Sequence, residues 1–358
     1  MKTEIYKVTE DNLQNICGIC AGFLRQGELV AFPTETVYGL GGNGFDSEAS
    51  RKIYEAKGRP SDNPLILHIG RKEQIYELVT EVSEKAEKLM DAFWPGPLTI
   101  ILNKSEKVPD TVSGGLKTVA IRFPSHPVAN ALLLSCDFPV AAPSANLSGK
   151  PSTTRGSHVI EDLSGRIKAI IDGGDVPIGV ESTIIDLSDE IPVLLRPGFI
   201  SLKRLQDVIG EVKVDPAITR ENIIHHTVEI EHPKAPGMKY RHYAPKAPVT
   251  IICGEEEKVI RAIKDHADPE TGILTVDEHK DLYDKGIVFS VGSKHEPLMI
   301  MQNLFDRLRR FDKEAVKRIY AEDLTPYDLT GAVMNRLLKS AGGNFVNCSD
   351  FEETFKEH

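Results

Sequence analysis

Short apolar runs bounded by Gly, Pro, Asn or Asp recur through the first 212 residues, and this pattern predicts strands. The runs are ELVAFP, PLILHI, LTIIL, TVAIRF, PVAAP, AIIDG, STIIDL and PVLLRP. Apolar residues at helical spacing predict helices over about 11–26, 47–57, 71–93, 126–136 and 201–209. Because the strands outnumber the helices, we predict a mixed sheet rather than a regular βαβ array.

The pattern weakens between residues 213 and 245, where HPKAPGMKYRHYAP is typical of an inter-domain connection. Beyond it, strands and helices alternate: VTIIC, a helix over 255–267, GILTV, GIVFSVG, a helix over 297–311, VKRIYAED and a helix over 329–341. Such alternation predicts a small parallel α/β domain. We therefore predict a first domain over 1–212, a connection over 213–245 and a second domain over 246–358.

The charge distribution argues against a bulk nucleic-acid binder. The chain has 358 residues and a net charge of −10. Residues up to Pro245 contain 27 basic and 32 acidic side chains, and the remainder contains 16 and 21, so each part carries −5.

No apolar run approaches the roughly 18 residues of a membrane span. The N-terminus has no apolar signal region, so we expect a cytoplasmic protein.

Two of the five cysteines form a CxxC motif, Cys17-Gly-Ile-Cys20. This motif allows a redox pair or half of a zinc site. However, both cysteines fall on one apolar helix face together with Leu13, Ile16 and Leu24, and no second CxxC or CxxH completes a metal site. We interpret the pair as core residues.

The stretch FPTETVYGLGGNGF contains Gly39-x-Gly41-x-x-Gly44, the spacing of a dinucleotide-binding turn. Such a turn needs a glycine directly after a strand and an acidic residue closing the next strand. Here the first glycine, Gly39, lies six residues after Pro33, and the acidic residue at about the right distance, Asp62, precedes the next strand instead of closing it. We reject the dinucleotide interpretation, and no Gly-Lys-Ser/Thr motif indicates a P-loop.

Cations and hydroxyls follow several predicted strands and helices instead. Lys57 and Arg59 lie where a helix breaks, Arg122 and Arg196 close two strands, and Ser144 follows a third. Strand ends are common positions for sites in α/β proteins. Cations there bind phosphate or carboxylate through charge-assisted hydrogen bonds. The sequence therefore indicates a site for an anionic ligand.

Eight ordered motifs carry a family resemblance: PTETVYGLG, KGRPSDNPL, PGPLT, AIRFPSHP, APSANLSG, ESTIID, LRPG and HYAP. They resemble those of the threonylcarbamoyl-AMP synthases, in the two-domain form of this YrdC-like family. The motifs cover most of residues 20–200, and HYAP marks the longer form. The resemblance implies an α/β fold with a YrdC-like twisted mixed sheet around a concave cavity, followed by a smaller Rossmann-like domain.

The resemblance also implies an activity. L-Threonine and bicarbonate combine into the N-carboxy amino acid, which attacks the α-phosphate of ATP and releases pyrophosphate. A tRNA threonylcarbamoyl transferase complex then receives the threonylcarbamoyl-adenylate and modifies adenosine 37 of tRNA, so this chain need not bind tRNA tightly. Mg²⁺ is expected to arrive with ATP.

Site residues are carried over from the motifs by position. The expected L-threonine contacts are Thr36, His68, Arg122, Ala142 (through its backbone) and Ser182. The expected ATP contacts are Arg59, Asn63, Thr118, Ser144, Ser152, Arg196 and Tyr243. The expected catalytic set is Lys57, Arg59, Ser144 and Asn146. The glycines beside Thr36 are expected to let the backbone approach the ligand.

No protein metal site is expected, although His225, His226, His232 and His242 lie close together in the sequence. Neighbouring histidines on an extended segment point in opposite directions. We also expect the cations to contribute little to folding, since they repel one another without ligand. We expect residues 213–245 to form a lid over the nucleotide.

Two alternatives remain open at this stage. A YrdC-like module that binds structured RNA is the main alternative, and the even acidic charge argues against it. A carbamoyl-phosphate-using maturation enzyme shares the domain type. Such enzymes carry acylphosphatase-like and zinc-finger segments, which this sequence lacks.

Overall fold

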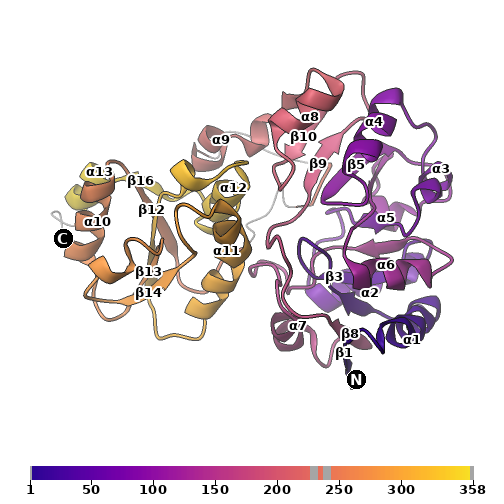
Figure 1. The fold of residues 1–358 in the computed structure, drawn as a ribbon, viewed down its shortest axis with the longest axis horizontal. Coiled ribbons are helices and arrows are strands. Elements are labelled where there is room, and N and C mark those ends of the chain that lie inside the picture. Colours follow the sequence, from indigo (N-terminus) through magenta and orange to yellow (C-terminus); the bar gives the residue numbers. More distant parts are fainter. Residues whose placement is uncertain (1, 226–232, 237–242, 355–358) are drawn as a thin grey trace. The chain divides into compact units, whose positions relative to one another are not determined.

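The computed structural model describes residues 2–225, 233–236 and 243–354 (Figure 1). The chain divides into two compact units. The first comprises Met1–Ser148, Ser152–Ile218 and Ile230–Lys239, and the second comprises Gly149–Pro151, Thr219–Glu229 and Tyr240–His358. None of the helices in the described ranges combines the length and apolar character that a membrane span requires.

The described strands of the first unit form one eleven-stranded sheet. They are β1 (Glu4–Lys7), β2 (Val30–Phe32), β3 (Gly39–Asn43), β4 (Ile66–His68), β5 (Leu98–Asn103), β6 (Thr118–Arg122), β7 (Val140–Ala142), β8 (Ala169–Asp172), β9 (Thr183–Asp186), β10 (Val193–Arg196) and β11 (Lys213–Val214). Their order is β1-β8-β2-β3-β7-β4-β6-β5-β9-β10-β11. Strand β4 is parallel to β6 but antiparallel to β7, and β5 is parallel to β9 but antiparallel to β6. The predicted mixed sheet is confirmed.

Helices of the first unit pack on this sheet according to the alternation of its side chains. They are α1 (Leu13–Arg25), α2 (Ser47–Lys57), α3 (Ile75–Leu78), α4 (Glu84–Phe93), α5 (Asp110–Ser113), α6 (Pro127–Leu134), α7 (Gly156–Leu163) and α8 (Leu202–Ile209), with 3₁₀ turns η1 (Lys72–Gln74) and η2 (Pro216–Ile218). Phe32 and Ala142 pack with α1 and α6. Their neighbours Ala31 and Ala141 face the other way and pack with α2, α4 and α7.

The CxxC cysteines belong to the core between α1 and α6, as predicted. Cys17 and Cys20 are fully buried and form no disulfide. Burial raises the pKa of the Cys17 thiol to about 11 and that of Cys20 to about 12, so both stay protonated.

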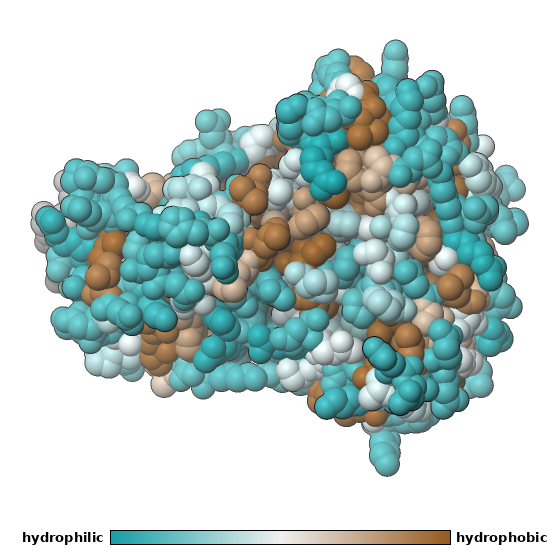
Figure 2. All heavy atoms as spheres, viewed as in Figure 1, coloured by the Kyte–Doolittle hydropathy of each residue, from teal (hydrophilic) through white to brown (hydrophobic). Residues whose placement is uncertain are grey.

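Hydrophilic residues dominate the face of the molecule in Figure 2, as expected when most apolar side chains are buried.

One apolar cluster on the sheet contains no residue of a described helix. It consists of Ile66, Ile101, Ala120, Ile184, Leu195 and Ala235, the last from the segment 233–236. Ile66 lies directly opposite Ala142 of β7, so this cluster shares the sheet face that α1 and α6 cover further along. His68 and Arg122 lie on this same face, two residues further along β4 and β6.

Two predictions about the first unit are corrected. The expected helix over 71–93 is divided into η1, α3 and α4, and Ser83 caps α4 through a hydrogen bond from the Ala86 amide. The glycine-rich stretch forms strand β3. A Cβ at Gly41 would lie 2.8 Å from a Val140 methyl group, and one at Gly44 would lie 2.6 Å from the Pro139 carbonyl oxygen. These glycines therefore permit close packing, and the expectation that they make room for a ligand is wrong for both.

The second unit is a parallel α/β domain, as predicted. Its strands are β12 (Val249–Cys253), β13 (Thr271–Thr275), β14 (Ile287–Ser290), β15 (Arg318–Glu322) and β16 (Phe345–Asn347). Its helices are α9 (Arg220–His225), α10 (Glu256–His266), α11 (Pro297–Phe311), α12 (Ala332–Ser340) and α13 (Cys348–Thr354), with 3₁₀ turns η3 (Lys280–Leu282) and η4 (Thr325–Tyr327). All strand pairs are parallel, in the order β14-β13-β15-β12-β16.

The predicted connection over 213–245 contains elements of both units. Strand β11 pairs with β10 in the first unit, whereas α9 belongs to the second. Residues 226–232 and 237–242 lie outside the described residues.

Candidate active site

The turn after β2 is a compact, buried hydroxyl cluster. The Thr34 hydroxyl donates to the Val37 carbonyl oxygen at 2.7 Å and accepts the backbone N–H of Thr36 at 3.2 Å. Its oxygen also lies 2.9 Å from the Thr36 hydroxyl. Such side-chain bonds to nearby backbone stabilise turns. The predicted threonine contact Thr36 is therefore held rigidly, with no exposed surface.

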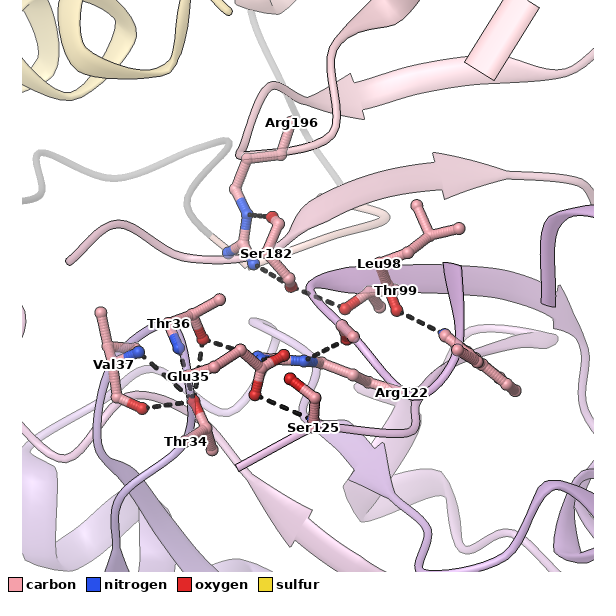
Figure 3. A network of polar contacts seen from close by, with 12 residues as sticks. Thr34, Glu35, Thr36, Val37, Leu98, Thr99, Arg122, Ser125, Ser182 and Arg196 are labelled. Carbon is pink, nitrogen blue, oxygen red and sulfur yellow. Dashed lines mark hydrogen bonds and ion pairs between the residues drawn. The ribbon is translucent and has the colours of Figure 1, made fainter. Parts of the chain in front are cut away.

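Arg122, the last residue of β6, links this turn to the sheet (Figure 3). Its Nη1 donates to the Thr36 hydroxyl at 2.8 Å, and its Nη2 donates to Oε1 of Glu35 at 2.6 Å. The second oxygen of Glu35 accepts the backbone N–H of Ser125 at 3.2 Å. Arg122 and Glu35 are 4% and 5% exposed. Sequence reasoning did not select Glu35, although a carboxylate directly after a buried strand, between two threonines, indicates a buried partner.

His68 lies beside Arg122 because β4 and β6 are parallel and these two residues are register partners. Its ring is buried, contacts Phe32 edge to face, and has Nδ1 3.1 Å from the Ile66 carbonyl oxygen. Burial, and secondarily the charge of Arg122, lowers the pKa of His68 to about 3. The imidazole is therefore neutral at pH 7.

A second hydroxyl network continues from the same face. Thr99 of β5 lies opposite Arg122, and its hydroxyl is 2.7 Å from that of Ser182. Arg196 donates to the Ser182 hydroxyl at 3.1 Å and to the Ser182 carbonyl oxygen at 3.0 Å (Figure 3). Its Nη1 donates to the Pro236 carbonyl oxygen at 3.2 Å. The structure thus places the predicted threonine contact Ser182 against the predicted nucleotide contact Arg196.

The predicted catalytic residues Lys57, Ser144 and Asn146 meet at the end of α2. Gly58 ends this helix in a left-handed conformation with φ of 62°. The Lys57 ammonium is buried and donates to the carbonyl oxygens of Ser144 and Asn146, whose side chains hydrogen-bond to each other. Lys57 and Arg196 are thus buried and hydrogen-bonded without ligand. These hydrogen bonds offset the mutual repulsion from which a small contribution to folding was expected, and the contribution itself stays a prediction.

The end of β4 and β6 that lies away from His68 and Arg122 carries three predicted nucleotide contacts, Arg59, Asn63 and Thr118. Arg59 donates to the carbonyl oxygens of Asn63 at 3.2 Å and Pro64 at 3.1 Å. The Asn63 side chain is buried, and its Oδ1 has no hydrogen-bond partner among the described residues. Thr118 begins the five-residue strand that Arg122 ends, which separates them by about 13 Å. The predicted nucleotide contacts Asn63 and Thr118 therefore lie at the opposite end of β4 and β6 from the predicted threonine contacts His68 and Arg122.

The remaining predicted contacts are distributed differently. Ala142 ends β7 opposite Ile66, and Ser152 is buried with its hydroxyl donating to Glu181. Tyr243 belongs to the second unit, where its ring stacks on Phe305 with centroids 5.1 Å apart. Its backbone has a φ of 64°, unusual for a residue other than glycine. Its contact with the nucleotide stays a prediction.

The described residues contain no group of three or more His, Cys, Asp and Glu side chains able to hold a metal ion. Three of the four clustered histidines, His226, His232 and His242, lie outside the described residues. Trp94 is buried and donates from its indole N–H to the Leu98 carbonyl oxygen at 2.7 Å, so it is a packed anchor.

Two family models match this chain, one after the other. Residues 22–198 match a family model described as "Telomere recombination", and residues 200–342 match one described as "Threonylcarbamoyl-AMP synthase, C-terminal domain". The threonylcarbamoyl-AMP synthase of Pyrococcus abyssi is 49% identical over 92% of this chain and 94% of its own length. A putative threonylcarbamoyl-AMP synthase of Mycobacterium tuberculosis is 36% identical over 53% of this chain and 87% of its own length.

A solved structure extends the likeness to the whole fold. The crystal structure of P. abyssi Sua5 complexed with L-threonine superposes with a TM-score of 0.88 at 45% identity, covering 97% of this chain and 99% of that one. From these similarities over nearly its full length, together with the arrangement of the site, it follows that the chain belongs to the threonylcarbamoyl-AMP synthase family.

Proposed function

We propose that this chain makes L-threonylcarbamoyl-adenylate from L-threonine, bicarbonate and ATP, with release of pyrophosphate. Family membership supports the reaction, and the related P. abyssi protein has been solved as a complex with L-threonine. The observation that carries the proposal is the buried Arg122, held between Glu35 and Thr36 at the end of β6. A guanidinium fixed in this way is suited to bind the threonine carboxylate.

The proposed chemistry needs no covalent enzyme nucleophile. The threonine amine and bicarbonate combine with loss of water to give an N-carboxylate. One of its oxygens attacks the α-phosphorus of ATP, the bond from that phosphorus to the bridging oxygen breaks, and pyrophosphate leaves. The chain's contribution is to hold two anions in line and to offset their repulsion.

The ends of β4 and β6 supply this alignment. His68 and Arg122 are register partners at one end, and Arg59 lies by Asn63 near the other. We propose that threonine binds at the first end and the phosphates at the second, with the α-phosphate between them near Lys57. Fixed cations in a largely buried site stabilise developing charge more strongly than they would in water.

Mg²⁺ is proposed to bind with ATP. Mg²⁺ in ATP sites is held mainly by phosphate oxygens and water and by few protein ligands. The described residues provide no cluster of metal ligands, and the Oδ1 atom of Asn63 is a buried oxygen without a partner among them. These features fit an ion that reaches the site on the phosphates, where it neutralises their charge.

The product is proposed to pass to a transferase that modifies adenosine 37 of tRNA. The net charge of −10 supports a chain that hands over a small molecule and does not hold tRNA tightly itself. The alternative, an RNA-binding module, predicts tRNA retention in filter binding regardless of ATP and threonine.

Pyrophosphate release from ATP tests the proposal directly. We expect release only when L-threonine and bicarbonate are both present, because neither alone provides the attacking carboxylate. Labelled bicarbonate should appear in an adenylate that also contains threonine. Equal pyrophosphate release after omission of either substrate would contradict the proposed reaction.

A further inference from the structure

The second unit has a cavity of its own, at the carboxyl ends of its strands. Its volume is about 460 Å³, within the range of about 300–1,000 Å³ of small-molecule sites. The lining residues used below are Gly254, Glu256, His279, Lys294, Glu322 and Tyr327. Gly254 directly follows β12, and Glu322 ends β15.

The chain topology favours ligand binding at this position. Strand β12 continues through α10 to β13, and β15 continues through α12 to β16. Strands β12 and β15 are neighbours, whereas β13 and β16 lie on opposite sides of the pair. The chain therefore leaves the two strands in opposite directions. Open α/β sheets bind their ligands outside the carboxyl ends of strands at such a switch point.

A buried carboxylate orients one histidine toward the cavity. Glu322 accepts hydrogen bonds from the Thr275 hydroxyl and the Tyr283 hydroxyl, both at 2.5 Å, and from Nδ1 of His279 at 2.8 Å. The bond to Glu322 raises the pKa of His279. His279 is 4% exposed, yet its Nε2 has no hydrogen-bond partner among the described residues. With Nδ1 directed at Glu322, Nε2 can donate to an anion when the imidazole is protonated, a state that the neighbouring Glu322 carboxylate favours.

The carboxylate of Glu256 occupies a position in the cavity that is surrounded by groups able to bind an anion. The Tyr327 hydroxyl donates to its Oε2 at 3.0 Å. Its Oε1 lies within ion-pair distance of two cation-forming groups, 3.3 Å from Nε2 of His279 and 3.5 Å from Nζ of Lys294. These three groups come from separate segments of the chain. The Glu256 side chain, however, is 50% exposed in the first turn of α10, so it can turn out to solvent.

We propose that the second unit binds a small molecule through an anionic head group, a carboxylate or a phosphate, which replaces the Glu256 carboxylate among Tyr327, His279 and Lys294. The first turn of α10 favours such a group, because helix N-termini attract anions and the N-cap residue Glu255 makes no side-chain cap bond. The site goes beyond the proposed synthase reaction and does not depend on it.

Titration calorimetry of the full-length chain tests the proposal, with inorganic phosphate and acetate as separate probes. Glu256→Gln removes the internal competitor, so we expect about tenfold tighter binding of at least one probe. Adding Lys294→Ala to this variant should weaken the same probe by about tenfold. Glu257→Gln, an exposed neighbour on α10, is the matched control and should behave as wild type.

The first unit is also expected to bind anions, so the location needs its own measurement. Hydrogen exchange should slow in peptides covering residues 254–260 and 291–296 when the probe binds. Arg59→Ala in the first unit should leave this protection unchanged. Tighter binding of phosphate alone identifies a phosphate ligand, and of acetate alone a carboxylate. Equal affinities of wild type and Glu256→Gln for both probes, or no protection of these peptides, would overturn the proposal.

Discussion

The Nη2 atom of Arg122 lies 2.6 Å from Oε1 of Glu35, and both side chains are almost completely buried. The same guanidinium reaches the Thr36 hydroxyl, and Glu35 also accepts the Ser125 amide. A buried charge left without its partner is costly, so each of these two residues fixes the other. The position of the proposed carboxylate receptor therefore depends on a residue that does not itself need to contact threonine.

Glu35→Gln should destabilise the fold and weaken threonine binding. Breaking a buried ion pair costs about 3–5 kcal/mol, because the remaining charge is uncompensated. We expect a loss of this order in urea unfolding and a rise in the KM for L-threonine that exceeds the rise for ATP.

Glu48→Gln is the matched control for this ion pair. Glu48 pairs with Arg51 at 2.9 Å, but both side chains are more than half exposed, so the variant should change stability by less than about 1 kcal/mol. A Glu35→Gln protein as stable as this control, with an unaltered KM for threonine, would show that Glu35 does not position Arg122.

Lys57→Ala should lose stability as well as activity. The buried ammonium donates to the carbonyl oxygens of Ser144 and Asn146, and hydrogen bonds to charged groups contribute roughly 1.5–3 kcal/mol each. Lys52 lies on the same helix and donates to the Gly27 carbonyl oxygen from a less buried position, so Lys52→Ala should cost less than about 1 kcal/mol. Thermal melts compare the two variants, and a Lys57→Ala protein with the melting temperature of wild type would contradict a structural role.

The stability of the first unit should depend on pH through His68. Its pKa is about 3 in the folded chain and about 6.5 when unfolded. Below pH 6.5 the unfolded chain takes up a proton that the folded chain does not, so the free energy of unfolding falls as the pH falls from 6.5 toward 3. At pH 5 the loss is about 2 kcal/mol.

Replacement of His68 provides the measurement. Relative to wild type, His68→Asn should lose about 2 kcal/mol less between pH 7 and pH 5 in urea unfolding. The exposed His225 is the control residue, and His225→Asn should retain the pH dependence of wild type. Identical pH dependence in wild type and His68→Asn would mean that His68 titrates normally in the folded chain.

Arg59→Ala should raise the KM for ATP and leave the KM for threonine nearly unchanged. Arg59 lies with Asn63 at the start of β4, away from Arg122. Loss of a charge-assisted bond to phosphate should raise the KM for ATP by roughly 10- to 100-fold and leave the KM for threonine within about twofold. Arg51→Ala, on the exposed side of α2, should alter neither value. Equal increases for both substrates would show that the site is not divided along the strands.

Much of the fold can be predicted from the spacing of apolar residues along the sequence. The apolar runs and the regular spacing in α1, α2, α6 and α11 predict elements that the structure contains within a few residues, because core packing reinforces the local pattern. The predicted helix over 71–93 failed at Thr80–Ser83, where the backbone turns so that Ser83 can cap α4. The helical spacing of apolar residues continues across this break, so the only sequence signal of a new helix is the capping residue Ser83.

The site was less predictable than the fold. Motif spacing selected Arg122 and Thr36, but Glu35 needs a tertiary partner that no local pattern reveals. The register of β4 with β6, which places His68 beside Arg122, depends on strand pairing between segments about fifty residues apart in the sequence. Strand β3 was missed because glycine is a poor strand former, and its glycines are required by the side chains of neighbouring strands.

The segment 233–236 lies after α9 in the sequence, but it completes the first unit. Ala235 fills the apolar cluster on the strands, the Pro236 carbonyl oxygen accepts from Arg196, and Lys234 pairs with Asp186 at 3.0 Å. The first unit of this chain is therefore not a continuous piece of sequence. A truncation at residue 212 would remove part of its apolar packing and a partner of Arg196 together with the second unit.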